Sequence, residues 1–242
     1  MEISCYLLLS PVHACIHNFI RLMTLIVLIV MKLKWLGHAS SLVKAEGKNI
    51  YIDPYGGDYS EKADLVLITH EHGDHCDLEK LSLIRGPETI ILTSSACAKK
   101  IPGNKVETMS PGDVREFGGV KIHAVEAYNY KRFRSPGVPY HPEGTQVGFI
   151  VESEGKKVYH LGDSDLLPSM EGLEGITIAL IPTMGRAVMD LDEAVEAAIA
   201  IGPEIAMPVH RRDTDPMEFK EKVESRSDVL VLVMDEGEEI TL

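Results

Sequence analysis

Residues 69–75, Thr-His-Glu-His-Gly-Asp-His, constrain this chain more than any other feature of its sequence. They follow residues 64–69, a nearly continuous apolar run of strand length, which is typical of a strand covered on both faces. The polar side chains are therefore expected on a loop at the C-terminal end of a buried strand. Three imidazoles and two carboxylates within seven residues predict a metal site there.

The spacing of these side chains favours two ions rather than one. His70 and His72 are two residues apart, so an extended turn can direct both imidazoles at one ion. Asp74 and His75 emerge further along the loop and can serve a second ion. The alternative is a surface loop that happens to be rich in histidine and acids, and the buried strand before it favours the dinuclear metal site.

Other segments strengthen this interpretation. Residues 35–40 (WLGHAS), 51–54 (YIDP), 159–165 (YHLGDSD) and 208–210 (PVH) accompany the run at 69–75. In this order they resemble the metallo-β-lactamase superfamily, from about Met31 to the C-terminus. The combination is most similar to a branch of small, largely uncharacterised metal-dependent hydrolases related to an ascorbate-6-phosphate lactonase. The resemblance implies an α/β fold, a four-layer αββα sandwich.

The resemblance also implies roles for residues that follow predicted strands. Asp163 follows strand 157–161 and matches the carboxylate that bridges the two metals. His210 follows strand 205–209 and matches the last histidine on the second metal. As isolated residues, Asp163 would be an ordinary turn aspartate and His210 a histidine at a strand end.

The third ligand of the first metal departs from the family pattern. The family has a histidine where this chain reads Glu-Ala-Tyr-Asn at 126–129, so Asn129 occupies that position. An amide oxygen there would favour manganese, magnesium or iron over zinc. His141 lies in a loop rich in glycine and proline that can fold back over the site, and we predict His141 as the ligand and Asn129 as a neighbouring polar group. His123 is a further candidate, but its mid-strand position better fits a core or face residue.

Three more polar residues are expected near the metals, where they would orient ligands or contact substrate: His38, Asp53 and His160. Turn formation is the alternative for Asp53, which precedes a proline, and for His38, which follows a glycine. Cys76 is expected to be buried or to support the site, and not to bind metal.

The expected chemistry is hydrolysis by a solvent water, with Asp74 as the catalytic residue that holds and deprotonates it. The expected cofactors are two divalent metal ions: zinc first, with manganese, iron or magnesium as alternatives. No Gly-x-Ser-x-Gly nucleophile motif is present. We expect the substrate to be a small anionic ester, lactone or phosphodiester. The rival functions are a nuclease or RNA-processing enzyme of the same superfamily, and a non-catalytic metal-binding or membrane-associated scaffold.

The composition indicates which binding partners and which cellular compartment to expect. The 242 residues carry a formal net charge of −13, which argues against nucleic acid as a partner because phosphate recognition requires clustered Lys and Arg. The short basic segment 130–134 is the exception, and a solvated loop is favoured there over an anion-binding role. The four cysteines show no metal-like pairing in sequence, so reduced thiols in the cytoplasm are expected. Assembly as a homo-oligomer is compatible with this composition.

Residues 1–30 lie outside the resemblance and form an apolar leader. Its uninterrupted apolar run, 22–31, is ten residues long, well short of the ~20 that span a bilayer. A basic start and a small-residue cleavage site, the marks of a signal peptide, are both lacking. We therefore interpret the leader as an upstream extension, with a natural start at Met31 and a single hydrolase domain over 31–242. An interfacial or partner-binding helix is the rival interpretation.

From Met31 onward the sequence predicts alternating strands and helices. Residues 33–45 are expected as one strand, joined to a strand at 49–53 by a turn at Glu46-Gly47-Lys48. The clearest helix is 190–201, with Asp190 and Glu193 at capping-box spacing and Gly202-Pro203 as its stop. The remaining predicted strands are 89–92, 120–127, 146–152, 157–161, 176–181, 205–209 and 229–234.

Overall fold

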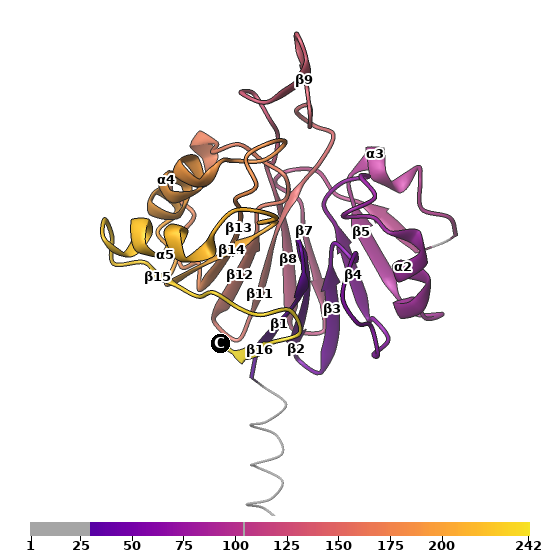
Figure 1. Ribbon diagram of the computed structural model, residues 1–242. Coiled ribbons are helices and arrows are strands. Elements are labelled where there is room, and N and C mark those ends of the chain that lie inside the picture. Colours follow the sequence, from indigo (N-terminus) through magenta and orange to yellow (C-terminus); the bar gives the residue numbers. More distant parts are fainter. Residues whose placement is uncertain (1–29, 104) are drawn as a thin grey trace, which may run out of the picture.

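The computed structural model describes residues 30–103 and 105–242, and it contains two mixed β-sheets packed face to face (Figure 1). Helices lie on the two outer faces. The predicted four-layer αββα sandwich is confirmed. Most of the leader, residues 1–29, lies outside the described residues, so the leader interpretation stays a prediction.

The first sheet has the strand order β16-β1-β2-β3-β4-β5-β6. Strands β3, β4, β5 and β6 run parallel, so their carboxyl ends lie at the same edge. All four residues of β4 are buried, as expected for the strand that precedes the histidine loop. The strands are β1 (Lys32–Gly37), β2 (Ser40–Ala45), β3 (Lys48–Ile52), β4 (Leu65–Ile68), β5 (Ile90–Thr93), β6 (Val106–Thr108) and β16 (Glu239–Thr241).

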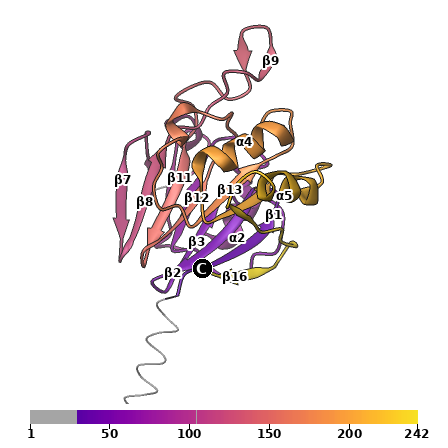
Figure 2. The same ribbon diagram turned by 90° about the vertical axis from the view of Figure 1, so that its left-hand side faces the viewer.

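The second sheet has the order β15-β14-β13-β12-β11-β8-β7, and its strands β12 to β15 are parallel. A separate hairpin of β9 (Phe133–Ser135) and β10 (Val138–Pro139) stands above the sheets (Figure 2). The sheet contains β7 (Val114–Phe117), β8 (Val120–Val125), β11 (Gly148–Ser153), β12 (Lys156–His160), β13 (Ile178–Pro182), β14 (Ile205–Val209) and β15 (Leu230–Val231).

The helices cover the outer faces of the sheets (Figure 1). Helices α2 (Leu78–Ile84) and α3 (Ser95–Ala98) pack against the first sheet, and α4 (Leu191–Ile201) and α5 (Pro216–Glu224) against the second. A short 3₁₀ turn, η1, spans Pro168–Met170. A third apolar cluster fills the space between the sheets and includes Leu33, Leu67, Phe149 and Leu180. This central core fixes the two sheets against each other.

Several predicted elements match the structure closely. Helix α4 begins after Asp190, whose carboxylate accepts a hydrogen bond from the Glu193 backbone N–H, and it ends at left-handed Gly202. Strand β14 has the predicted bounds. The predicted turn joins β2 and β3 through Glu46 and Gly47, both with positive φ.

The prediction of one strand over 33–45 was wrong. The chain reverses after Gly37 (φ +100°) and His38 (φ +51°), so β1 and β2 are antiparallel neighbours. The sequence also gave no expectation of α2, α3, α5, β6, β7 or β16. Of the predicted strand 229–234, only Leu230–Val231 pairs. Among residues 30–103 and 105–242, no helix is both long and apolar enough to cross a bilayer.

Candidate metal centre

Loops at one end of the sandwich converge on a cluster of histidines and aspartates. The loop after β4 supplies His70, His72, Asp74 and His75. Asp53 follows its parallel neighbour β3. From the second sheet, Asp163 follows β12 and His210 follows β14, two strands that flank β13. Parallel strands end at the same edge, and this is why residues distant in sequence meet here.

One group of side chains that could hold a metal ion consists of His70, His72 and His141. Nδ1 of His72 lies 3.1 Å from Nε2 of His70 and 3.0 Å from Nε2 of His141. The same His70 and His141 nitrogens are 4.0 and 3.7 Å from Oδ2 of Asp163. The structure thus brings His141, and not Asn129, to the pair His70 and His72.

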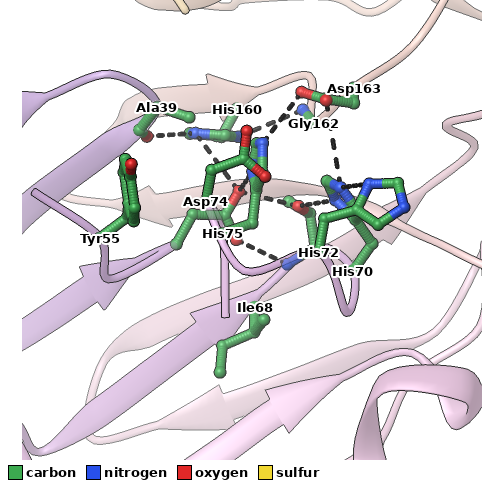
Figure 3. A network of polar contacts seen from close by, with 12 residues as sticks. Ala39, Tyr55, Ile68, His70, His72, Asp74, His75, His160, Gly162 and Asp163 are labelled. Carbon is green, nitrogen blue, oxygen red and sulfur yellow. Dashed lines mark hydrogen bonds and ion pairs between the residues drawn. The ribbon is translucent and has the colours of Figure 1, made fainter. Parts of the chain in front are cut away.

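A second group lies on the other side of Asp163 and contains His38, Asp74, His75 and His210. Nε2 of His75 is 3.2 Å from Oδ1 of Asp163, and Nε2 of His210 is 3.6 Å from Oδ2. Oδ2 of Asp74 is 3.7 Å from the His210 nitrogen. Figure 3 shows His70 and His72 on one side and Asp74 and His75 on the other, with Asp163 above them. Asp163 therefore lies between the two groups of candidate ligands.

Buried polar atoms in the cluster fit metal ligands. Nε2 of His75, Oδ1 of Asp163 and both ring nitrogens of His210 are buried and have no hydrogen-bond partner among the described residues. Leaving such atoms unpaired is costly, and buried polar groups almost always have a partner. A neutral imidazole and a carboxylate are the ligand types that divalent metals take up in proteins. The donor set therefore fits divalent ions.

The protonation states of four histidines in the cluster also favour metal binding. Burial lowers the pKa of His70 and of His72, and it lowers the pKa of His141 and of His210 to about 4. These four imidazoles are neutral near pH 7, with a lone pair available for a metal.

His75 is the exception among the histidines. Burial alone would lower its pKa, but the neighbouring Asp163 and Asp53 carboxylates outweigh burial and hold the pKa well above its usual range. Conversely, His75 and His210 hold the pKa of Asp163 well below its usual range despite burial. His75 and Asp163 are thus oppositely charged neighbours, although Nε2 of His75 and Oδ1 of Asp163, 3.2 Å apart, do not form a hydrogen bond. A cation at this position would take the place of the His75 proton.

Asp53 holds the loop and His75 in place from below. Its Oδ2 lies 2.8 Å from Nδ1 of His75 and accepts a hydrogen bond from the Thr69 hydroxyl at 2.8 Å. Its Oδ1 accepts from the Thr69 backbone N–H at 2.7 Å, and the Thr69 hydroxyl also lies 3.0 Å from Nδ1 of His70. Asp53 has a positive φ of 46°, so it both forms a turn and orients a candidate ligand. The sequence analysis did not predict these contacts of Thr69.

Asn129 plays the corresponding part for His141. Its amide oxygen lies 2.7 Å from Nδ1 of His141, and its amide nitrogen donates to Asp165 at 3.0 Å. Both ends of the amide are engaged and the side chain is buried. The Asn129 amide therefore lies behind His141 as a neighbouring polar group, which agrees with the preference for His141 over Asn129 as the ligand.

The basic segment 130–134 divides into two parts. Arg132 is largely buried, and it pairs with Asp165 at 2.6 Å and with Glu193. Lys131 also pairs with Glu193, at 2.6 Å. The expectation of a solvated loop is wrong for Arg132, since its guanidinium ties this segment to α4. Asp165, which supports both Arg132 and Asn129, lies two residues after Asp163 and was not singled out from the sequence.

His38 contributes to the site as well as to the turn. Its Nε2 lies 3.3 Å from Oδ2 of Asp74, and its backbone oxygen accepts a hydrogen bond from the His210 N–H. The hydrogen bond with His38 is the main cause that lowers the pKa of Asp74, which is thus a carboxylate at neutral pH. His38 therefore fixes the position of Asp74.

The other expected residues lie further from the cluster. Nε2 of His160 is 2.7 Å from the Ala39 oxygen, and its Nδ1 accepts from the Gly162 N–H, so His160 joins the β1–β2 turn to the loop that carries Asp163. His123 faces outward from the second sheet and pairs with Glu152 at 2.9 Å. Cys76 is buried against the first sheet.

A pocket of about 400 Å³ opens over the cluster. Asp74, Asp163, His72 and His210 line it, and so do three arginines that come from three different loops. Of these three, Arg134 lies in the basic segment 130–134 that the sequence analysis names. The remaining lining residues are Tyr140, Met184, Arg186, Ala187 and Arg212.

Comparison with known proteins places the chain in a family. Residues 32–210 match the model of the β-lactamase superfamily domain. A UPF0173 metal-dependent hydrolase of Methanopyrus kandleri is 34% identical over 227 residues, which cover 86% of this chain and 98% of that protein.

Two solved structures are also similar to this chain. One is a protein of Parabacteroides distasonis whose name proposes a metal-dependent hydrolase, with a TM-score of 0.78, 32% identity and coverage of 84% of this chain and 92% of that one. The other is a metallo hydrolase from the archaeon Ignicoccus hospitalis, with a TM-score of 0.73, 28% identity and coverage of 88% and 98%. The chain therefore belongs to the β-lactamase superfamily of metal-dependent hydrolases, in the group that includes the UPF0173 proteins.

Proposed function

We propose that the protein is a dinuclear metal hydrolase that cleaves a small anionic ester, lactone or phosphodiester with a water molecule. The observation that carries this proposal is the arrangement of two donor groups around Asp163, with unpartnered buried atoms on His75, His210 and Asp163 itself. His70, His72 and His141 would hold one ion, and Asp74, His75 and His210 the other, with Asp163 between them.

Ions held there would supply Lewis acidity toward a substrate oxygen and would lower the pKa of water. The protein's own residues supply the rest. Asp74 is ionised and lines the pocket, so its carboxylate can accept a hydrogen bond from the attacking water and then its proton. His38 keeps that carboxylate oriented. Zinc suits the histidine-rich donor set, and manganese, iron or magnesium are the alternatives.

The pocket supports a small anionic substrate rather than nucleic acid. Its volume of about 400 Å³ suits a small molecule, and the arginines that line it favour negative charge. The whole chain, by contrast, carries a net charge of −13, which opposes binding of an extended phosphate backbone. We place the enzyme in the cytoplasm, where Cys76 and Cys97 stay reduced thiols.

The proposal is tested by metal content and activity together. Protein purified without chelator should contain about two equivalents of divalent metal per chain, measured by plasma mass spectrometry. A screen of p-nitrophenyl phosphodiesters, carboxylic esters and lactones should find a hydrolysed class. Dialysis against a chelator should abolish that activity, and the removed metal should restore it.

Asp74→Ala and His75→Ala should each lower kcat by at least a hundredfold while the circular dichroism spectrum stays unchanged, because the motif lies on a loop of a rigid scaffold. Asp228→Ala is the matched control, since this exposed aspartate lies outside the cluster, and it should retain full activity. Full activity in Asp74→Ala, or a metal content of one equivalent with full activity, would contradict the dinuclear mechanism.

A further inference from the structure

Arg186 and Arg212 line the pocket over the metal centre without a partner. Both side chains belong to exposed residues, and neither forms a hydrogen bond or an ion pair with any residue in the described parts of the chain. Other arginines of this protein are paired: Arg132 with Asp165, and Arg226 with Glu196. Two unpaired guanidinium groups beside a metal cluster therefore need an explanation.

The charge of the pocket points to an anion. Among the described residues, Asp74 and Asp163 are the only carboxylates that line it, and both are candidate metal ligands whose charge two divalent ions would offset. The third arginine, Arg134, donates to the Tyr140 oxygen at 2.8 Å and lies 3.5 Å from Nε2 of His72. With metals in place the wall of the pocket is strongly positive, although the whole chain is acidic.

The loops that carry Arg186 and Arg212 follow neighbouring parallel strands. Arg186 lies after β13, and Arg212 lies after β14, two residues beyond His210. His210 and Arg212 both have positive φ, at 49° and 45°. Residues other than glycine avoid this conformation unless the surroundings impose it, and it recurs at binding sites. Both arginines line the pocket that contains the candidate metal ligands, and the backbone conformation of Arg212 fixes its place two residues beyond His210.

We infer that Arg186 and Arg212 bind a second anionic group of the substrate, a phosphate or a carboxylate remote from the bond that is cleaved. The planar guanidinium donates two parallel N–H groups to either anion. The substrate is then a small ester, lactone or phosphodiester whose scissile group lies at the metals and whose remote anion lies at the arginines. This inference rests on the proposed hydrolase function.

Matched substrate pairs test it on the metal-loaded enzyme. One pair is the p-nitrophenyl ester of pentanoic acid and the mono-p-nitrophenyl ester of glutaric acid, which differ by a terminal carboxylate. The other is the p-nitrophenyl ester of thymidine 5′-phosphate without and with a 3′-phosphate. Arg186→Gln and Arg212→Gln should each raise KM for the member with the remote anion by about tenfold, because a charge-assisted hydrogen bond is lost. The kcat values, and KM for the other member, should change by less than about twofold.

Arg226→Gln is the matched control and should change neither KM. A larger rise in KM for the glutarate ester would identify the remote group as a carboxylate, and a larger rise for the 3′-phosphate would identify it as a phosphate. Equal effects of Arg186→Gln and Arg212→Gln on both members of each pair, or no effect on either, would overturn the inference.

A binding measurement separates this inference from the proposed function. By isothermal titration calorimetry, the metal-loaded wild type should bind glutarate more tightly than pentanoate, and the double variant Arg186→Gln/Arg212→Gln should lose that preference. An equal preference in wild type and double variant overturns the anion site, whatever the hydrolysis assays give. An arginine-dependent preference without hydrolysis of any substrate would instead count against the hydrolase function.

Discussion

Single residues behind the cluster decide how its imidazoles point. The Asp53 carboxylate lies 2.8 Å from Nδ1 of His75, and the Asn129 oxygen lies 2.7 Å from Nδ1 of His141. Each partner is an acceptor for a proton on Nδ1, and this contact turns Nε2 of each ring toward Asp163. A carboxylate on one side of the site and an amide on the other thus each orient the ring of one candidate metal ligand.

The third ligand of the first ion is tested by comparing two alanine variants. His141→Ala removes an imidazole from the group with His70 and His72, so the affinity for one of the two metal equivalents should fall by at least a hundredfold. Asn129→Ala leaves the imidazole and removes only its support, so the loss should be nearer tenfold. Competition with a chromophoric chelator measures both. A larger loss in Asn129→Ala than in His141→Ala would contradict the assignment.

The histidine pKa values predict that acid destabilises the metal-free protein. In the folded state burial lowers the pKa of His141 and of His210 to about 4, whereas an unfolded chain titrates near 6.5. Below pH 6.5 the unfolded state therefore binds protons that the folded state does not, and stability falls as the pH drops toward 4. At pH 4.5 the loss should be on the order of 2 kcal/mol for each of these two histidines.

His75 affects the pH dependence of stability in the opposite direction, and its effect falls at higher pH. Its pKa is raised, so its contribution is complete below about 6.5 and is lost only as the pH rises through its folded value. Urea unfolding of chelator-treated protein between pH 4.5 and 7.5 measures the trend, and His141→Gln should reduce the slope below pH 6.5. Stability that is constant or increases on acidification from pH 6.5 to 4.5 would contradict the prediction.

At the scale of elements, the site depends on how loops leave the strand ends. After β12 the chain turns through Gly162, at φ +66°, before it reaches Asp163. A Cβ on Gly162 would approach the Thr69 Cβ to 3.3 Å. Thr69 in turn bonds to Asp53 and contacts His70. Gly162 thus allows the Asp163 loop to pack directly on the support of the histidine loop.

Gly162→Ala is expected to displace Asp163 and lower metal affinity by about tenfold, with kcat reduced as well. Gly155→Ala is the matched control. Gly155 also has a positive φ, +75°, but a Cβ there would meet no atom within 4 Å. Both variants should lose about 1 kcal/mol of stability from backbone strain, which thermal unfolding measures. Equal metal affinities in the two variants would show that the contact with Thr69 is unimportant.

At the scale of the whole molecule, the C-terminal strand β16 forms the edge of the first sheet beside β1, close to Met31. Met31 is buried in the central core, and its backbone oxygen accepts a hydrogen bond from the Leu242 N–H at 2.9 Å. Strand β16 pairs with β1 through Leu33 and Ile240. Among the described residues, Met31 and β1 therefore make the contacts that complete this sheet edge.

A chain that starts at Met31 is expected to fold and to retain full activity. It keeps Met31 in the core and the pairing of β1 with β16, and every candidate ligand lies further along the sequence. Its melting temperature should lie within about 3 °C of that of the full chain, since less than about 1 kcal/mol is expected to be lost. Unfolding or aggregation of the shorter chain would show that residues 1–30 contribute to the fold.

Short-range sequence patterns alone determined several features of this protein. The buried strand β4 with its histidine loop, the turn at Glu46-Gly47 and the helix between Asp190 and Gly202 all depend on residues a few positions apart. Hydrophobic periodicity, helix capping and the preference of glycine for positive φ each depend on residues only a few positions apart, so they can be recognised in the sequence itself. The family resemblance, carried by motifs in a fixed order, added the αββα architecture.

Only the tertiary structure decided which distant side chains meet. The glycines and prolines of its loop made His141 a candidate, but its contact with His72, 69 positions away, depends on Asn129, Asp165 and Arg132, which hold that loop. The reversal at Gly37 and His38 brings the His38 imidazole to Asp74, 36 positions away, and the sequence offered that turn only as an alternative. The arginines of the pocket converge for the same reason. Strand ends that are far apart in the sequence share one edge only after the two sheets have packed.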